Sequence, residues 1–193
     1  MEVLEASARY AESQMDVRSR DAAVDAALGA CARALSRGEV PLVAPAAQAA
    51  ARVAQLASGA PNTLPRLAQL VDQLVGWALD VSMERRDARA LTDNLARFGL
   101  NCWRSERVVA QTLVRNLDQD LSRLASSARD ETQVIQVASV ARCLSAVLRN
   151  LERDATHAQT CARFVEALLS ARTAAQEPHA WDDVCHELCI DLL

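Results

Sequence analysis

The amino-acid sequence predicts an all-α protein, built as a helical-hairpin solenoid of about nine helices. Apolar residues recur at steps of three and four along nearly the whole chain, and no segment alternates as a strand would. Hydrophobic residues make up 51% of the 193 residues, with only 5 Gly and 5 Pro. This composition excludes disordered, collagen-like and low-complexity sequence.

Helices are expected at about residues 2–15 and 20–36, and Gly38 is expected to end the second because glycine adopts left-handed conformations easily. Pro41 and Pro45 indicate a connector before an alanine-rich helix that ends near Ser58. The next helix begins at Thr63, and its apolar residues fall on one face at steps of four and three: Leu67, Val71, Leu74, Ala78 and Val81.

Four more helices are expected in the second half of the chain, at about residues 84–98, 105–126, 130–151 and 156–174. Gly99 is expected to end the first of these. Asp130 and Glu131 place negative charge in the first turn of the third, where the helix dipole favours it. A last helix follows Pro178 and carries Trp181.

Taken in consecutive pairs from the second helix, the helices repeat at about 40 residues, the length of HEAT and armadillo-like hairpins. We therefore expect residues 1–193 to form a single helical-repeat segment. A closed helical bundle is the alternative, because short loops also permit it.

The charge balance disfavours nucleic acid and membrane as partners. All 21 basic residues are arginine, and the net charge is −4. No global positive field therefore attracts a polyanion. No run of 18 apolar residues occurs, and the N-terminus lacks signal-peptide features. We expect a cytoplasmic protein without direct nucleic-acid or membrane binding.

The sequence shows no enzyme signature. The five glycines are scattered, so no Gly-rich phosphate loop exists, and neither a GxSxG nor an HExxH motif occurs. We expect no catalytic residues and no cofactor in this segment.

A weak metal candidate lies near the C-terminus. Cys185 and Cys189 are four residues apart and share a helix face, and His179 is close in sequence, a set that suits zinc. Both thiols also fall on the apolar stripe of Trp181 and Leu188, so buried packing thiols are the favoured interpretation. The zinc interpretation predicts that a chelator lowers the melting temperature.

Four residues are interaction candidates. Arg85, Arg86 and Arg89 form the densest basic spot, but interleaved acidic residues favour a solvated helix face over a phosphate or RNA contact. Trp77 is expected to fill a gap between helices, with a partner groove as the alternative. Gly76 beside it costs up to about 1 kcal/mol in a helix, which suggests close approach of a neighbouring backbone.

Asp118 and Asp120 resemble paired carboxylates only superficially. Residues two apart on a helix point away from each other, so we expect surface ion pairs with the flanking Arg115 and Arg123.

A segment of the central region resembles a known family. Leu64-Pro65-Arg66-Leu67, followed by residues 70–80, is similar to the N-terminal HEAT-repeat region of the SMG-type phosphatidylinositol-kinase-related protein kinase of nonsense-mediated mRNA decay. The specific part runs from Val71-Asp72 through Gly76-Trp77 to Asp80. The likeness continues more loosely to about Leu151, but Phe98 and Trp103 are separated where the family has adjacent aromatics.

The resemblance implies a scaffold segment of a large cytoplasmic and nuclear Ser/Thr kinase, which docks accessory regulatory subunits and has its catalytic domain elsewhere. Residues 61–155 would be the kinase-solenoid-like region, residues 1–60 unplaced helices and residues 156–193 the last helix pair. A free-standing α-helical adaptor unrelated to kinases is the alternative, and a zinc-linked sensor built on Cys185 and Cys189 is a third.

Overall fold

The computed structural model describes residues 2–14, 16–57, 63–80, 83, 85–151, 155–175, 181–182, 184–186 and 188, and within these ranges it contains helices and no strand. The helices are α1 (Glu2–Ser13), α2 (Val17–Ser36), α3 (Val40–Ala54), α4 (Thr63–Ala78), α5 (Arg85–Ser105), α6 (Arg107–Ser127), α7 (Glu131–Leu148) and α8 (Ala155–Arg172). The described residues between 181 and 188 are also helical. The expected all-α class is confirmed.

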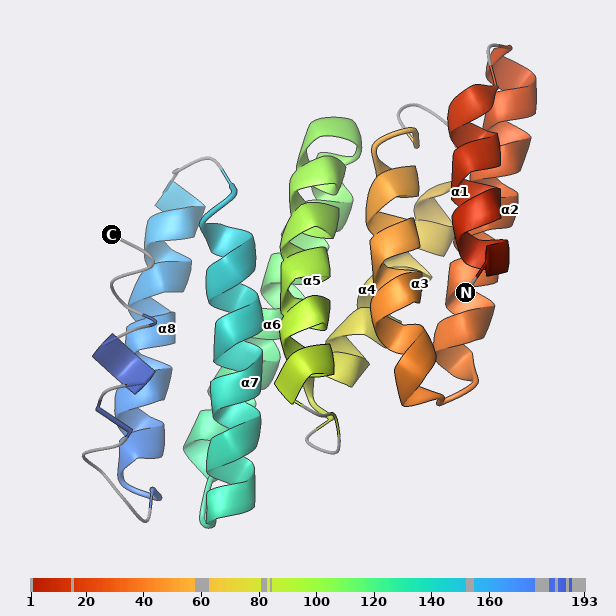
Figure 1. Cartoon of the computed structure of the whole chain (residues 1–193). Helices are drawn as coiled ribbons and strands as arrows, with labels where there is room; N and C mark the ends of the chain where they lie inside the picture. The colour runs from red at the N-terminus through yellow and green to blue at the C-terminus, as the bar shows by residue number, and fades with distance from the viewer. Residues whose placement is uncertain are drawn as a thin grey trace.

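The helices form two layers that run side by side from α1 to α8 (Figure 1). Helices α1, α3, α5 and α7 pack in sequence in one layer, and α2, α4, α6 and α8 pack in sequence in the other. Among the described helices, each contacts only those one or two positions away in the chain, apart from a small contact between α4 and α7. α1 and α8 consequently lie at opposite ends of the array.

Local signals fix several helix ends, although α2 begins at Val17 and not near residue 20 as expected. The Asp16 carboxylate accepts a hydrogen bond from the Ser19 backbone N–H at 2.9 Å and caps α2. Gly38 follows the end of α2 with a φ of 71°, a conformation that costs glycine no steric energy. Asp130 caps α7 in the same way, through the Gln133 N–H.

The expected connector at Pro41 and Pro45 is wrong, because α3 runs through both residues. Pro41 lies in the first turn, where its missing N–H would have had no partner in the helix. Pro45 lies inside α3, where it removes one hydrogen bond to the turn before it. The long apolar run that follows keeps the segment helical despite this loss, since Ala46, Ala47 and Ala50 are completely buried.

The expectations for two glycines are also wrong, and for opposite reasons. Gly99 does not end a helix: α5 continues through it to Ser105. A Cβ atom on Gly99 would meet Val147 Cγ1 at 3.0 Å and Leu113 Cδ2 at 3.4 Å. Gly76, in contrast, is exposed, and a Cβ atom there would meet nothing within 4 Å. The close approach therefore occurs at Gly99, where α5 packs against α6 and α7.

Polar side chains link α5 to its layer neighbour α3. Asn94 donates to the carbonyl oxygen of Ala44 at 3.2 Å, and Asn101 donates to that of Ala51 at 2.6 Å. The Ser105 hydroxyl donates to Ala54 O at 2.8 Å, one turn further along. Small alanine side chains on α3 let these donors reach main-chain oxygens, and the links fix the register of the two helices.

The second layer carries equivalent links. Gln73 on α4 donates to Ala32 O on α2, and Asn116 on α6 donates to the Asp72 carboxylate on α4. The partners are 41 and 44 residues apart, respectively. These separations agree with the period of about 40 residues that the helix pattern predicts.

None of the described helices combines the length and the apolar character that a membrane-spanning segment requires.

Candidate functional site

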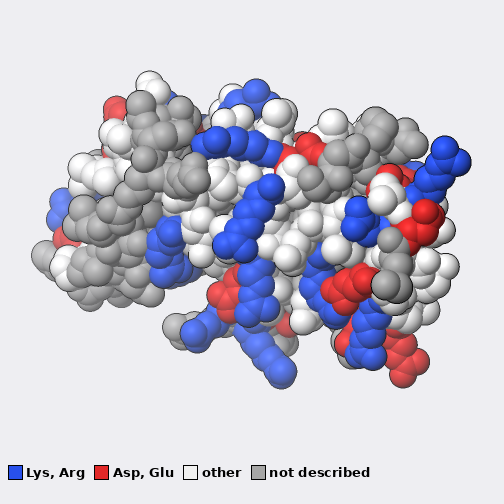
Figure 2. All heavy atoms as spheres, turned by 90° about the horizontal axis from the view of Figure 1, so that it is seen from above, with Lys and Arg blue, Asp and Glu red and all other residues white. Residues whose placement is uncertain are grey.

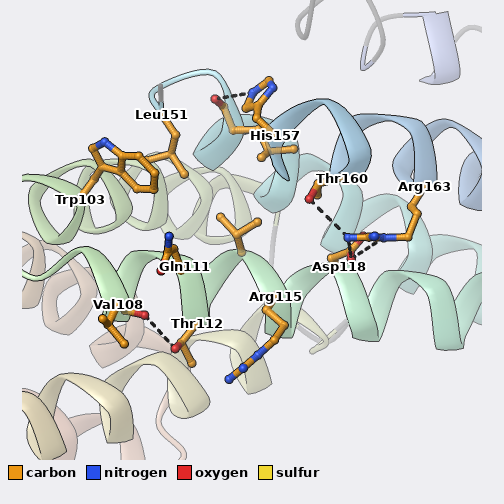
Figure 3. A pocket seen from close by; sticks show the side chains of 12 residues that line it. Trp103, Val108, Gln111, Thr112, Arg115, Asp118, Leu151, His157, Thr160 and Arg163 are labelled. Carbon is orange, nitrogen blue, oxygen red and sulfur yellow. Dashed lines mark hydrogen bonds and ion pairs between the residues drawn. The ribbon is translucent and has the colours of Figure 1, made fainter. Parts of the chain in front are cut away.

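A cavity of about 330 Å³ opens between α6 and α8, bounded also by the C-terminal ends of α5 and α7 (Figure 3). One face of α6 forms much of its wall, because Val108, Gln111, Thr112, Arg115 and Asp118 recur at steps of three and four. The opposite wall comes from the first turns of α8. The cavity thus lies between two neighbours of the same layer.

The apolar part of the wall gathers around Trp103. This half-buried indole, near the end of α5, lines the cavity together with Val114, Leu148 and Leu151. The guanidinium carbon of Arg107 lies 4.0 Å from the centre of the Trp103 ring, a cation–π arrangement that holds the indole in place. At the mouth, Val108 leaves 69% of its surface exposed, so apolar surface continues outward from the cavity.

The polar part of the wall is built on an ion pair between the two helices. Arg163 on α8 donates through Nε to Asp118 Oδ2 at 2.8 Å, and its Nη2 lies 2.7 Å from the same oxygen. The Asp118 side chain is only 8% exposed, whereas Arg163 is 41% exposed. Within the described part of the chain, Asp118 Oδ1 is buried and has no hydrogen-bond partner.

This geometry corrects the expectation for the two aspartates. Asp120 forms the predicted surface pair with Arg123, at 2.7 Å. Asp118 instead faces inward and pairs with α8 rather than with Arg115. The period of the buried stripe explains the difference, because Asp118 lies three residues before the buried Leu121 and next to the buried Leu117.

His157 completes the cavity at the start of α8. Its Nε2 lies 3.3 Å from the carbonyl oxygen of Leu148, and its Nδ1 lies 3.6 Å from the Cys161 sulfur. A carbonyl oxygen only accepts, so Nε2 is the donor, and in the neutral ring Nδ1 then accepts from the thiol. The imidazole is thereby held between the end of α7 and the next turn of α8.

The cavity carries an excess of positive charge. Arg115 and Arg163 line it, whereas Asp118 is the single acidic residue among the described residues of its wall. The Asp118 carboxylate is already engaged by Arg163, whereas Arg115 is exposed and makes no ion pair with any described residue. The site can therefore offer a guanidinium and several hydrogen-bonding groups next to an apolar wall.

The interaction candidates from the sequence do not lie in this cavity. Trp77 is half-buried on α4, and its indole N–H donates to Leu35 O on α2 at 3.4 Å, as expected for a residue that fills a gap between helices. Arg86 and Arg89 are exposed on α5 and pair with no described acidic residue; the side chain of Arg85 is outside the described residues. Viewed from above, arginines are spread among acidic and uncharged residues (Figure 2).

The zinc candidate remains a prediction. Cys185 is half-buried and packs against the core, whereas His179 and Cys189 lie outside the described residues. Among the described residues, no group of three His, Cys, Asp or Glu side chains could hold a metal ion.

Three of the other cysteines are buried thiols. Burial raises the pKa of Cys31 to about 12 and that of Cys143 to about 11, and it raises the pKa of Cys102 further. These thiols therefore remain neutral in the folded protein at physiological pH, as expected for cysteines that act as small apolar residues.

Comparison with protein-family models, with curated proteins and with solved structures yields no match to this chain. The fold and the site define it as a layered all-α protein with an amphipathic, positively charged cavity between α6 and α8.

Proposed function

We propose that this chain is a non-catalytic helical-solenoid scaffold that mediates protein–protein interaction. The packing order of the helices is the main support for this proposal. Apart from a small contact between α4 and α7, described helices contact neighbours one or two positions away, and α1 and α8 lie at opposite ends. An array of this kind grows along one direction and presents extended surfaces, which repeat proteins use to bind other proteins.

A HEAT or armadillo-like repeat is the class that fits this packing best. The polar links within each layer join residues about one hairpin apart in sequence, as in Gln73 to Ala32 and Asn116 to Asp72. A closed bundle would instead bring the first and last helices together around one core.

For the larger protein, we propose a scaffold segment of the SMG-type kinase of nonsense-mediated mRNA decay, with the kinase's accessory regulatory subunits as partners. The support is the resemblance over residues 64–80, which here cover α4 from its second residue to its end and the two residues after it, in the middle of the array. Val71 and Leu74 are completely buried there, and the Asp72 carboxylate accepts a hydrogen bond from Asn116. A segment of similar sequence is therefore expected to form a helix that packs in a similar way. A free-standing helical adaptor unrelated to kinases is the second candidate.

The size of the native polypeptide separates these two candidates. An antibody raised against residues 63–126 is used to blot lysate of the source organism, with antibody pre-absorbed on the purified chain as the control. A single very large band supports the kinase proposal. A band near 21 kDa alone contradicts it and favours the adaptor.

A further inference from the structure

We propose that the cavity between α6 and α8 binds a short acidic segment of a partner protein, with an apolar side chain anchored against Trp103 and a carboxylate held by Arg115. The inference rests on the scaffold function proposed above and names the chemistry of the partner. It is carried by the charge of the cavity, by its apolar wall and by its size.

The charge of the cavity favours a negatively charged group on the partner. The carboxylate of Asp118 is buried and engaged by Arg163, so it cannot attract a cation in solution strongly. Arg115 is exposed at the same wall and has no ion partner among the described residues. A carboxylate that enters beside Arg115 would make a charge-assisted hydrogen bond without displacing an existing ion pair.

The apolar wall selects a segment with at least one hydrophobic side chain. Trp103, Val114 and Leu151 line the cavity, and each is only partly buried in the chain alone. Val108 exposes 69% of its surface at the mouth. Covering these groups would remove apolar area from water, and aromatic residues in such pockets commonly dominate binding energy.

The size of the cavity favours a side-chain anchor over a large cofactor. Ligand pockets range from about 300 to 1,000 Å³, and the 330 Å³ here lies at the lower end. One apolar side chain with its neighbouring acidic residue fits such a volume, and the rest of the segment would lie along the outside of α6.

The test uses the purified full chain and fluorescence anisotropy of three short labelled peptides. The first alternates glutamate and leucine, the second replaces each glutamate by lysine, and the third replaces each leucine by serine. We expect saturable binding of the first peptide, weakened by added salt because exposed charges are screened. We expect little binding of the other two peptides.

Two charge reversals on the same helix localise the binding. Arg115→Glu changes a residue that lines the cavity. Arg123→Glu is the matched control, since Arg123 is exposed on α6 but does not line the cavity. We expect Arg115→Glu to weaken binding by about tenfold or more, and Arg123→Glu to leave it nearly unchanged. Circular dichroism checks that both variants keep the wild-type helix content.

Several results would overturn the inference: no binding of the glutamate–leucine peptide, equal binding of the lysine peptide or of the serine peptide, or equal loss in both arginine variants. Binding of free glutamate as strongly as the peptide would also overturn it, because a small anion would then suffice. None of these results bears on whether the chain is an extended scaffold, which the scattering measurement described in the Discussion tests separately.

Discussion

The guanidinium of Arg163 on α8 pairs with the buried carboxylate of Asp118 on α6, and its Nη2 lies 2.7 Å from Asp118 Oδ2. The pair joins two helices of one layer and forms the polar wall of the cavity (Figure 3). Because the two residues are 45 apart in sequence, the contact spans one helical hairpin.

Removing the arginine of this pair should destabilise the protein. Arg163→Met leaves a carboxylate that is only 8% exposed without its partner, and breaking a buried pair in this way typically costs several kcal/mol. Arg163 is 41% exposed, so water reaches the site and we expect a smaller loss, about 2 kcal/mol in the free energy of unfolding. Urea denaturation measures it.

The double variant provides the control for this prediction. Asp118→Asn removes the charge itself, so Arg163→Met should cost less in the Asp118→Asn background than in the wild-type chain. Additive losses in the double-variant cycle would show that the two side chains do not interact.

Two glycine-to-alanine substitutions should have opposite effects. At Gly99 a Cβ atom would meet Val147 Cγ1 at 3.0 Å, so the Val147 side chain would have to give by a few tenths of an ångström, and we expect Gly99→Ala to cost about 1–3 kcal/mol. At Gly76 nothing lies within 4 Å, so Gly76→Ala should stabilise the helix by up to about 1 kcal/mol. Thermal melts of both variants test the pair, and a stabilised Gly99→Ala variant would contradict the cost expected for this contact.

Cysteine reactivity should follow burial and the contact with His157. Under native conditions iodoacetamide should label Cys161, which is half-buried and donates to an imidazole, before it labels Cys31, Cys102 or Cys143. Peptide mapping by mass spectrometry reads the order of labelling.

The His157→Gln variant distinguishes whether Cys161 reacts because it is accessible or because His157 activates its thiol. His157→Gln should slow labelling of Cys161, whereas His186→Gln, at an exposed histidine elsewhere, should not. Rapid labelling of the three buried thiols in the folded protein would contradict their placement in the core.

The stability of the protein should fall at alkaline pH, in part through Cys31. Its thiol has a pKa of about 12 in the folded chain against an ordinary value of 9.0. Between these pH values the unfolded chain releases the proton and the folded chain keeps it, so unfolding becomes more favourable as pH rises. Cys31→Ala should make the decline of melting temperature above pH 9 less steep, and an unchanged slope would contradict this.

Much of the helical framework could be predicted from the sequence because apolar period and capping chemistry are local. Gly38 follows the end of α2 as expected, and the acidic pair Asp130 and Glu131 lies at the start of α7, where Asp130 is the N-cap residue and Glu131 is in the first turn. The expectations for Gly99 and Pro45 are wrong because the local preference of each residue is weak compared with packing: α5 makes the close contact with α7, and α3 buries a nearly continuous alanine surface.

The candidate site could be predicted only in part. The position of Asp118 within the buried stripe of α6 is visible in the sequence, and it marks an acidic residue that needs a partner. That partner, Arg163, lies 45 residues away on another helix, so no local pattern identifies it. The same applies to Trp103 and His157, which line one cavity only because α5, α6, α7 and α8 come together there.

The central claim, an extended two-layer array rather than a closed bundle, is tested most directly by small-angle X-ray scattering of the purified chain. A compact domain of 193 residues has a radius of gyration of about 16 Å. We predict a clearly larger value for the monomer and a distance distribution with a long tail. A radius near 16 Å with a symmetric distribution would contradict the account.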